Sequence, residues 1–171
     1  MSEIINKVAA NESLVTLDLE ELLDGGERVI FDLANALDGP LLREKDFREY
    51  VKTKDWSVFE NKNVGVTCSV EAIIPSWAYM LIASKIQPLA NSIVYGGEDG
   101  IEKHLIDLAV DAFDLNHLTG KKVILKGCSH IHNRDYAYMK ATSTLVPVVT
   151  SLMYGEPCST VPVFKAPKKA I

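Results

Sequence analysis

The chain has 171 residues, of which 47% are hydrophobic and 24% are charged, with a formal net charge of −5. These proportions are typical of a soluble globular domain, and the negative charge argues against nucleic-acid binding, which needs clustered Lys and Arg. No apolar stretch reaches the ~20 residues of a membrane-spanning helix, and the N-terminus lacks the pattern of a secretory signal. Three cysteines, an odd number, argue against a disulfide framework. We therefore expect a single cytoplasmic domain over residues 1–171, with reduced thiols.

Residues 1–60 are interpreted as an N-terminal extension. Residues 14–19 alternate apolar and polar side chains, as a half-buried strand does, and residues 27–33 are a second strand candidate. The Asp-Gly-Gly sequence at 24–26 is a turn signal. The two strands are therefore expected to pair antiparallel at the sheet edge. An amphipathic helix is predicted to follow over residues 42–52.

The rest of the chain contains an internal repeat, because residues 64–98 and 124–156 share one pattern. Cys68-Ser69 corresponds to Cys128-Ser129 at an offset of 60 residues, and the offset is 59 in the remainder of the repeat. A repeat of this period indicates a duplicated supersecondary unit, here strand, helix and strand. Tyr79 and Tyr138 fall at equivalent positions, where they either line a pseudo-symmetric pocket or pack the helix on the sheet.

A helix predicted from about residue 99 to residue 113 joins the two copies. Strands separated by a dozen or more residues pair in parallel, with right-handed crossovers. The predicted fold class is therefore α/β, a mainly parallel sheet built from two duplicated β-α-β units, with an antiparallel N-terminal edge.

The three cysteines are the candidate ligands of a metal. Cys68 and Cys128 each end a predicted parallel strand, and Cys158 follows the last strand, so all three are expected at the carboxyl edge of the sheet. Three thiolates suit zinc, iron or an iron–sulfur cluster. His130 is a candidate fourth ligand because, in an extended loop, it shares a face with Cys128, and Glu156, water or a partner protein are the alternatives for that position. The candidate ligands are dispersed, and free cysteines often pack as small apolar side chains, so the absence of any cofactor is an equal alternative.

The function remains open between three hypotheses at this stage. The first is a metal-binding or iron–sulfur accessory protein. The second is a cofactor-free interaction or regulatory module with buried structural cysteines, acting as a homo-oligomer such as a homodimer or through a protein partner, without nucleic acid or membrane. The third is a thiol enzyme with one nucleophilic cysteine. The sequence contains no phosphate-binding loop and no nucleophile elbow, so no motif indicates whether the protein is an enzyme.

Four segments carry a resemblance to a known family: residues 42–48, 67–80, 126–129 and 154–162. With these segments the chain resembles, over nearly its whole length, the uncharacterised bacterial domain-of-unknown-function family 2480. The resemblance implies a small cytoplasmic protein without an assigned reaction, and a link to gene neighbourhoods for iron–sulfur cluster assembly. Cys68, Cys128 and Cys158 match the cysteine positions of that family, whereas His130 falls where the family varies. The resemblance therefore favours the metal hypothesis.

Overall fold

The computed structural model describes residues 13–23, 25–127 and 130–167. The chain divides into two compact units, and each is described by itself. The first unit comprises Met1–Asp24 and Leu105–Ile171, and the second comprises Gly25–His104. Helix α4 (Glu98–Asp111) begins in the second unit and ends in the first. The prediction of one domain over the whole chain stays a prediction.

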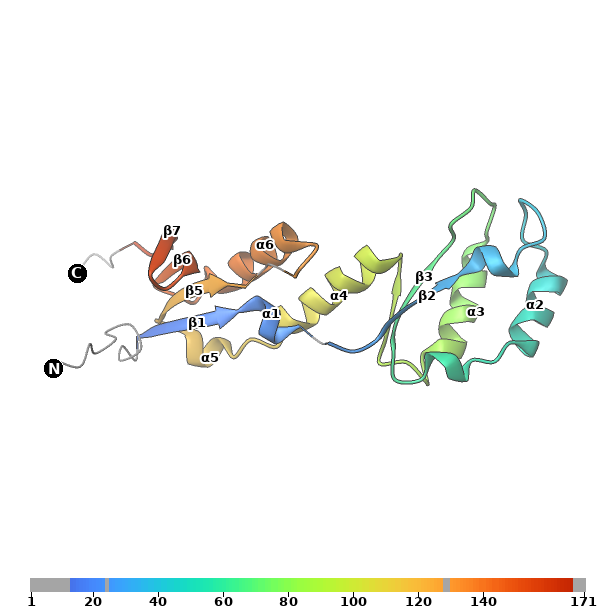
Figure 1. The fold of residues 1–171 in the computed structure, drawn as a ribbon, viewed down its shortest axis with the longest axis horizontal. Coiled ribbons are helices and arrows are strands. Elements are labelled where there is room, and N and C mark those ends of the chain that lie inside the picture. Colours follow the sequence, from blue (N-terminus) through green and yellow to red (C-terminus); the bar gives the residue numbers. More distant parts are fainter. Residues whose placement is uncertain (1–12, 24, 128–129, 168–171) are drawn as a thin grey trace. The chain divides into compact units, whose positions relative to one another are not determined.

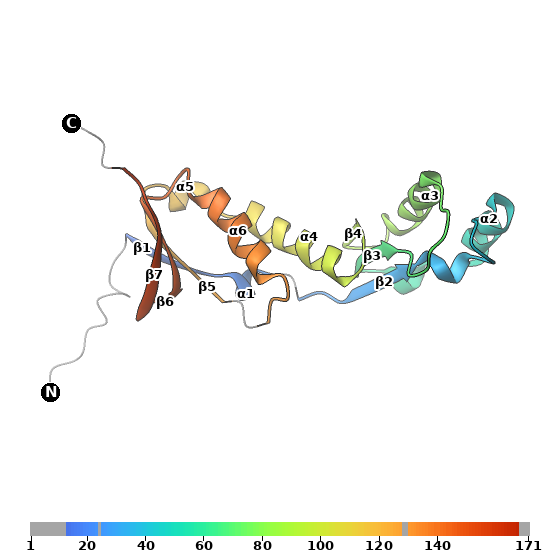
Figure 2. The ribbon, with the colours of Figure 1, turned by 90° about the horizontal axis from the view of Figure 1, so that it is seen from above.

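The first unit is built on a four-stranded sheet (Figure 1), whose order is β1-β5-β6-β7. Its strands are β1 (Leu14–Asp18), β5 (Lys122–Lys126), β6 (Ser151–Glu156) and β7 (Ser159–Lys165). β1, β5 and β6 run parallel, and β7 pairs antiparallel with β6. Helices α1 (Leu19–Leu22), α5 (Leu115–Leu118) and α6 (Arg134–Leu145), with the C-terminal part of α4, complete the unit. Figure 2 shows α6 along one face of the sheet.

The second unit is built on a three-stranded parallel sheet of order β2-β3-β4. Its strands are β2 (Arg28–Asp32), β3 (Asn63–Thr67) and β4 (Ser92–Tyr95). Helices α2 (Glu44–Thr53) and α3 (Ser76–Ile86) pack with them, and two short 3-10 helices, η1 (Leu33–Ala36) and η2 (Ser57–Phe59), lie in the connections. None of the described helices has both the length and the apolar character needed to cross a membrane.

The two crossover helices bury equivalent faces because small and branched apolar residues recur every four positions on each. Ala78, Ile82 and Ile86 of α3 are fully buried in the second unit. Their counterparts in the first unit, Ala137, Ala141 and Leu145 of α6, are also buried. Burial of an apolar helix face against a sheet is the main source of stability for such an element. Each copy of the repeat therefore has its own core.

The predicted fold class is confirmed as α/β with mainly parallel sheets, but the position of the antiparallel edge was wrong. β1 pairs in parallel with β5, and β2 pairs in parallel with β3, in separate sheets. The antiparallel edge is β7, near the other end of the chain. Alternation of apolar and polar residues indicates a half-buried strand but does not specify its partner. The duplicated unit is therefore larger than predicted, since each copy includes one N-terminal strand.

Candidate functional site

A cluster of charged groups lies at the carboxyl ends of β1, β5 and β6 in the first unit. Lys126 Nζ is 3.0 Å from a carboxylate oxygen of Asp18 and 3.9 Å from one of Glu156. The hydrogen bond between Lys126 and Asp18 lowers the pKa of Asp18 and raises the pKa of Lys126. Nearby, the backbone N–H of His130 donates to Glu20 Oε1 at 2.6 Å. This edge therefore holds polar groups outside the ends of parallel strands, where α/β proteins bind ligands.

Gly127 brings the backbone directly against Asp18 at this edge. Its φ is 79°, a left-handed conformation that side chains disfavour. A Cβ atom at Gly127 would also overlap the Asp18 carboxylate. The position therefore requires glycine for two independent reasons.

The equivalent edge of the second unit is organised by Asp32. Its carboxylate accepts hydrogen bonds from the backbone N–H groups of Ala34 at 2.9 Å and Ser69 at 3.0 Å. A further hydrogen bond from the Ser69 side chain is the main cause that lowers the pKa of Asp32. The half-buried Cys68 precedes this serine, and its Sγ donates to the carbonyl of Val70 at 3.3 Å. Asp32 thus fixes the loop that contains Cys68.

The strand register fixes the offset between the two copies of the repeat up to the ends of their strands. Strands β3 and β4 recur as β5 and β6 at an offset of 59 residues and in the same pairing register, with Thr67 in the place of Lys126, while β1 takes the place of β2. Continuing by one residue, Cys68 corresponds to Gly127. The predicted equivalence of Cys68 and Cys128 at an offset of 60 stays a prediction, because Cys128 lies outside the described residues.

The structure places the other predicted ligands as follows. Cys158 is exposed in the turn between β6 and β7, and His130 is exposed at the same carboxyl edge of the first unit. Cys68 belongs to the second unit, where it packs at the margin of the core. Cys128 lies outside the described residues. Among residues 13–23, 25–127 and 130–167, no group of three or more His, Cys, Asp and Glu could hold a metal ion. The metal site of Cys68, Cys128, Cys158 and His130 stays a prediction.

An apolar groove of about 600 Å³ lies between α6 and the β6–β7 hairpin. Its walls include Tyr138, Met139 and Thr142 of α6 and Leu125, Tyr154 and Val163 of the strands. Met139 is 75% exposed, and Val163 and Tyr154 are also exposed. Tyr138 and Tyr154 meet edge to face, with ring centroids 5.0 Å apart. A cavity of this size and lining is within the range of protein binding sites.

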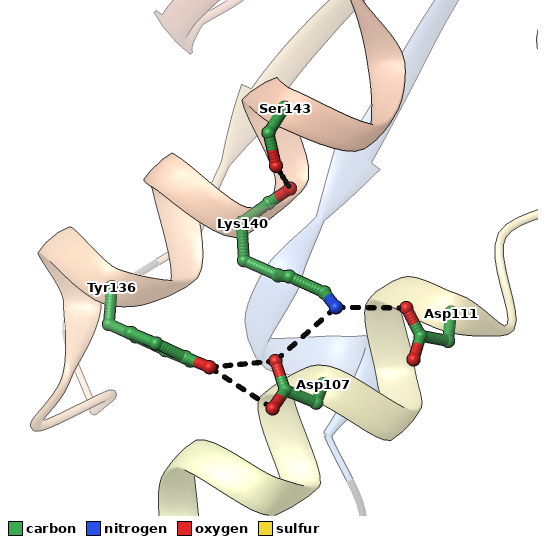
Figure 3. Close-up of polar contacts among 5 residues, drawn as sticks. All are labelled: Asp107, Asp111, Tyr136, Lys140 and Ser143. Carbon is green, nitrogen blue, oxygen red and sulfur yellow. Dashed lines mark hydrogen bonds and ion pairs between the residues drawn. The ribbon is translucent and has the colours of Figure 1, made fainter.

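Polar contacts between α4 and α6 hold the helical wall of the groove (Figure 3). The Tyr136 hydroxyl bonds to both carboxylate oxygens of Asp107, at 2.9 and 3.0 Å. Lys140 Nζ lies 3.1 Å from Asp111 and 3.5 Å from Asp107. The pKa of Lys140 is raised, mainly by its hydrogen bond to Asp111. Because Tyr138 and Met139 lie between Tyr136 and Lys140 on α6, these contacts position the groove side chains.

The model of one protein family matches residues 2–166, nearly the whole chain, and its description is Protein of unknown function (DUF2480). The chain belongs to the DUF2480 family. Neither the curated proteins nor the solved structures gave a match. The resemblance seen in the sequence is thereby confirmed at the level of the family.

This DUF2480 protein has a second, smaller hollow at the equivalent place in its second unit. The hollow measures about 160 Å³ and is lined by Val66, Tyr79, Ala83, Ile93, Val94 and Tyr95. These are the counterparts of six residues that line the groove. Tyr79 and Tyr95 also meet edge to face, with centroids 5.5 Å apart. The prediction that the repeated tyrosines pack the helix on the sheet is therefore confirmed, since Tyr138 and Tyr79 each lie against the core of their own unit, and each also lines a hollow of that unit.

Sequence reasoning did not identify the two aspartates, Asp18 and Asp32, as equivalent residues. Each ends the first strand of its unit and accepts a hydrogen bond from a backbone N–H two residues later. The signal was present, because an Asp after a run of apolar residues and before a helix is a typical N-cap. The repeated segments do not reveal the equivalence, because Asp18 and Asp32 lie outside residues 64–98 and 124–156.

Proposed function

We propose that this protein is an interaction module whose first unit binds an apolar segment of a partner protein in the groove between α6 and the β6–β7 hairpin. The observation that carries the proposal is the exposed apolar lining of this groove, with Met139 75% exposed at its rim. Monomeric proteins rarely leave contiguous apolar surface of this kind uncovered.

The extent of the apolar surface favours a protein segment over a small molecule. Val161 of β7 is 58% exposed and pairs with Tyr154, so apolar surface continues from the groove along the hairpin. A small ligand in the groove would leave Val161 uncovered, whereas a segment of several residues would cover both. Methionine suits a surface that adapts to the side chains of a partner, because its side chain is flexible and polarizable.

The test uses a phage-displayed library of random twelve-residue peptides, selected on the full chain and counter-selected on Met139→Glu. We expect enriched peptides with spaced apolar residues, and at least tenfold weaker binding to Met139→Glu by fluorescence anisotropy. Met80→Glu is the matched control, because Met80 is the equivalent residue of the second unit and is 71% exposed. A library that yields no enriched sequence, or peptides that bind both variants alike, would contradict the proposal.

We propose metal binding as a second candidate function, because Cys158 and His130 lie at the same edge of the first-unit sheet. Both side chains are exposed there, and Cys128 stands two residues before His130 in the sequence. Thiolate and imidazole ligands fit zinc, iron or an iron–sulfur cluster, which would make the protein an accessory of cluster assembly. This proposal requires the reducing environment of the cytoplasm.

Elemental analysis and visible absorption of the anaerobically purified chain test this second candidate. We expect bound zinc or iron that is lost in Cys158→Ser and retained in the neighbouring control Ser159→Ala. Metal-free wild-type protein, or metal content that is unchanged in Cys158→Ser, would exclude a site that uses this thiol.

A further inference from the structure

Strand β4 differs from the other edge strands of the two sheets in having no protection against pairing. Within the described residues the edge strands of the two sheets are β1, β7, β2 and β4. β1 ends in Asp18, and β2 contains Arg28 and Asp32. β7 contains Pro162 and Lys165. Charged residues and proline are the usual means by which proteins keep sheet edges from pairing. The sequence of β4, Ser-Ile-Val-Tyr, has neither.

The duplicated unit shows what covers this edge. β6 is the counterpart of β4, and its outer edge pairs antiparallel with β7. As a result Leu152 of β6 is fully buried opposite Phe164. Its counterpart Ile93 is only partly buried, and among the described residues β4 pairs with β3 alone. The second unit therefore lacks, within its described residues, the antiparallel strand that the first unit has.

The backbone hydrogen bonds define which groups of β4 face outward. The N–H of Asn63, at the start of β3, donates to the carbonyl of Glu27, the residue before β2. The N–H of Gly96, just after β4, donates to the carbonyl of Val66 on β3. Successive residues of a strand direct their backbone groups to opposite sides. The N–H and C=O groups of Ile93 and Tyr95 therefore point away from β3, toward the open edge.

We propose that β4 pairs antiparallel with β4 of a second copy of this chain, about a two-fold axis at Val94. In this register Ile93 of one copy lies opposite Tyr95 of the other, and these two form the hydrogen-bonded pairs. The two Val94 residues face each other as the intervening non-hydrogen-bonded pair. A symmetric contact of this kind uses the same patch on both copies.

The side chains of β4 complement themselves in this register, which is why a second copy is the expected occupant. In the first unit, Leu152 pairs with the aromatic Phe164, and Tyr154 pairs with the aliphatic Val161. In the proposed dimer, Ile93 in the place of Leu152 meets an aromatic residue, and Tyr95 in the place of Tyr154 meets an aliphatic one. Tyr95 is 79% exposed in the single chain, against 44% for Tyr154. The second copy would thus provide the cover that β7 provides in the first unit.

Sedimentation analysis of the full chain tests the proposal. We expect a dimer for the wild type and at least tenfold weaker dimerisation for Tyr95→Lys, because a charge at an edge strand opposes pairing. Tyr154→Lys is the matched control in the first unit and is expected to leave the dimer intact. A monomeric wild type at micromolar concentrations, or a dimer unaffected by Tyr95→Lys, would overturn the proposal.

A cysteine introduced at Val94 tests the register. Non-hydrogen-bonded antiparallel pairs have Cα atoms ~4.5 Å apart, within the range of a disulfide. Mild oxidation of Val94→Cys is expected to yield a disulfide between the two copies at residue 94, located by mass spectrometry of the digested protein. Met153→Cys, the equivalent change in β6, is expected to give none. A dimer that forms no disulfide at residue 94 would refute this interface, even if the protein dimerises elsewhere. The groove variant Met139→Glu is expected to dimerise normally, so this proposal and the proposed function are tested separately.

Discussion

Replacement of Asp32 by alanine is expected to destabilise the second unit by removing the acceptor that fixes the Cys68 loop. The carboxylate accepts from the N–H groups of Ala34 and Ser69, at 2.9 and 3.0 Å. The first of these bonds caps the helix η1, and the second connects the end of β2 to the residue that follows Cys68. Both are lost together in Asp32→Ala, because alanine has no side-chain acceptor.

The expected cost is about 2 kcal/mol. Hydrogen bonds to a charged group contribute ~1.5–3 kcal/mol when buried. Asp32 is only half-buried, so solvent screening reduces each of its two backbone bonds to about 1 kcal/mol. A loss of about 2 kcal/mol raises the equilibrium constant for unfolding about 30-fold.

The effect depends on pH with a definite sign. Hydrogen bonds lower the pKa of Asp32 in the folded state, so the carboxylate stabilises the protein above the pKa of the unfolded chain. This contribution is lost as the pH falls through the folded-state pKa, below about 4. The difference between wild type and Asp32→Ala should therefore be complete at pH 7 and should narrow below pH ~4.

Tryptophan fluorescence during urea unfolding measures the change in stability of the second unit. The two tryptophans of the chain, Trp56 and Trp77, both belong to the second unit. Asp32→Asn is the control, because its amide oxygen keeps an acceptor and lacks the charge, and it should fall between the wild type and Asp32→Ala at pH 7. The reasoning is refuted if the stability difference is as large at pH 3 as at pH 7, or if Asp32→Asn costs as much as Asp32→Ala.

Three further predictions test the packing and the thiols. Gly65→Ala should lower the free energy of unfolding by ~1–3 kcal/mol in the same fluorescence assay, because the alanine Cβ would lie 2.5 Å from the carbonyl oxygen of Gly96. An unchanged free energy of unfolding would contradict this close contact. Iodoacetamide at neutral pH should alkylate the exposed Cys158 at least ten times faster than the half-buried Cys68, as measured by mass spectrometry, and equal rates would argue against this difference in access. Burial raises the pKa of Tyr79, so Tyr79→Phe should remove a component that titrates above pH 10 in an ultraviolet titration; an unchanged high-pH limb would argue against it.

The sequence was sufficient to predict the α/β class and the repeated β-α-β units because the relevant signals are local. Apolar runs with β-branched residues mark β3 and β5, and the helical period marks α2 over Glu44–Thr53, close to the predicted residues 42–52. The partners of β1 and β2 are not local information. The turn signal between them favoured an antiparallel pair, whereas each strand instead joins its own copy of the repeat.

The cysteine alignment shows how a one-residue difference alters the interpretation of a site. Matching Cys68 with Cys128 requires a gap, whereas the paired strands of both units need none. At the end of a strand, a shift of one residue turns a side chain to the opposite face. Agreement of residue types at an offset of 60 therefore does not by itself identify equivalent thiols when the paired strands repeat at an offset of 59. Whether the thiols meet stays a prediction, and Cys128 lies outside the described residues.

The sequence patterns could not predict the groove, because it depends on tertiary packing. Tyr138 was recognisable from the repeat, but the exposure of Met139 and Val163 depends on where the β6–β7 hairpin lies against α6. Helix α6 carries apolar residues on more than one side, so its period alone does not separate the buried face, with Ala137, from the exposed one.

Comparison of the two units connects the two proposals through one structural requirement. Leu152 and Ile93 occupy the same place in the two repeats, and each needs an antiparallel strand beside it to be fully buried. In the first unit the chain supplies β7, which buries Leu152 and also forms a wall of the groove through Val163. In the second unit the described residues supply no such strand, the hollow is about 160 Å³, and the edge is free of charge. A second copy at β4 would complete the second unit, whereas the groove belongs to the first unit, so loss of dimerisation and loss of groove binding should be separable by mutation.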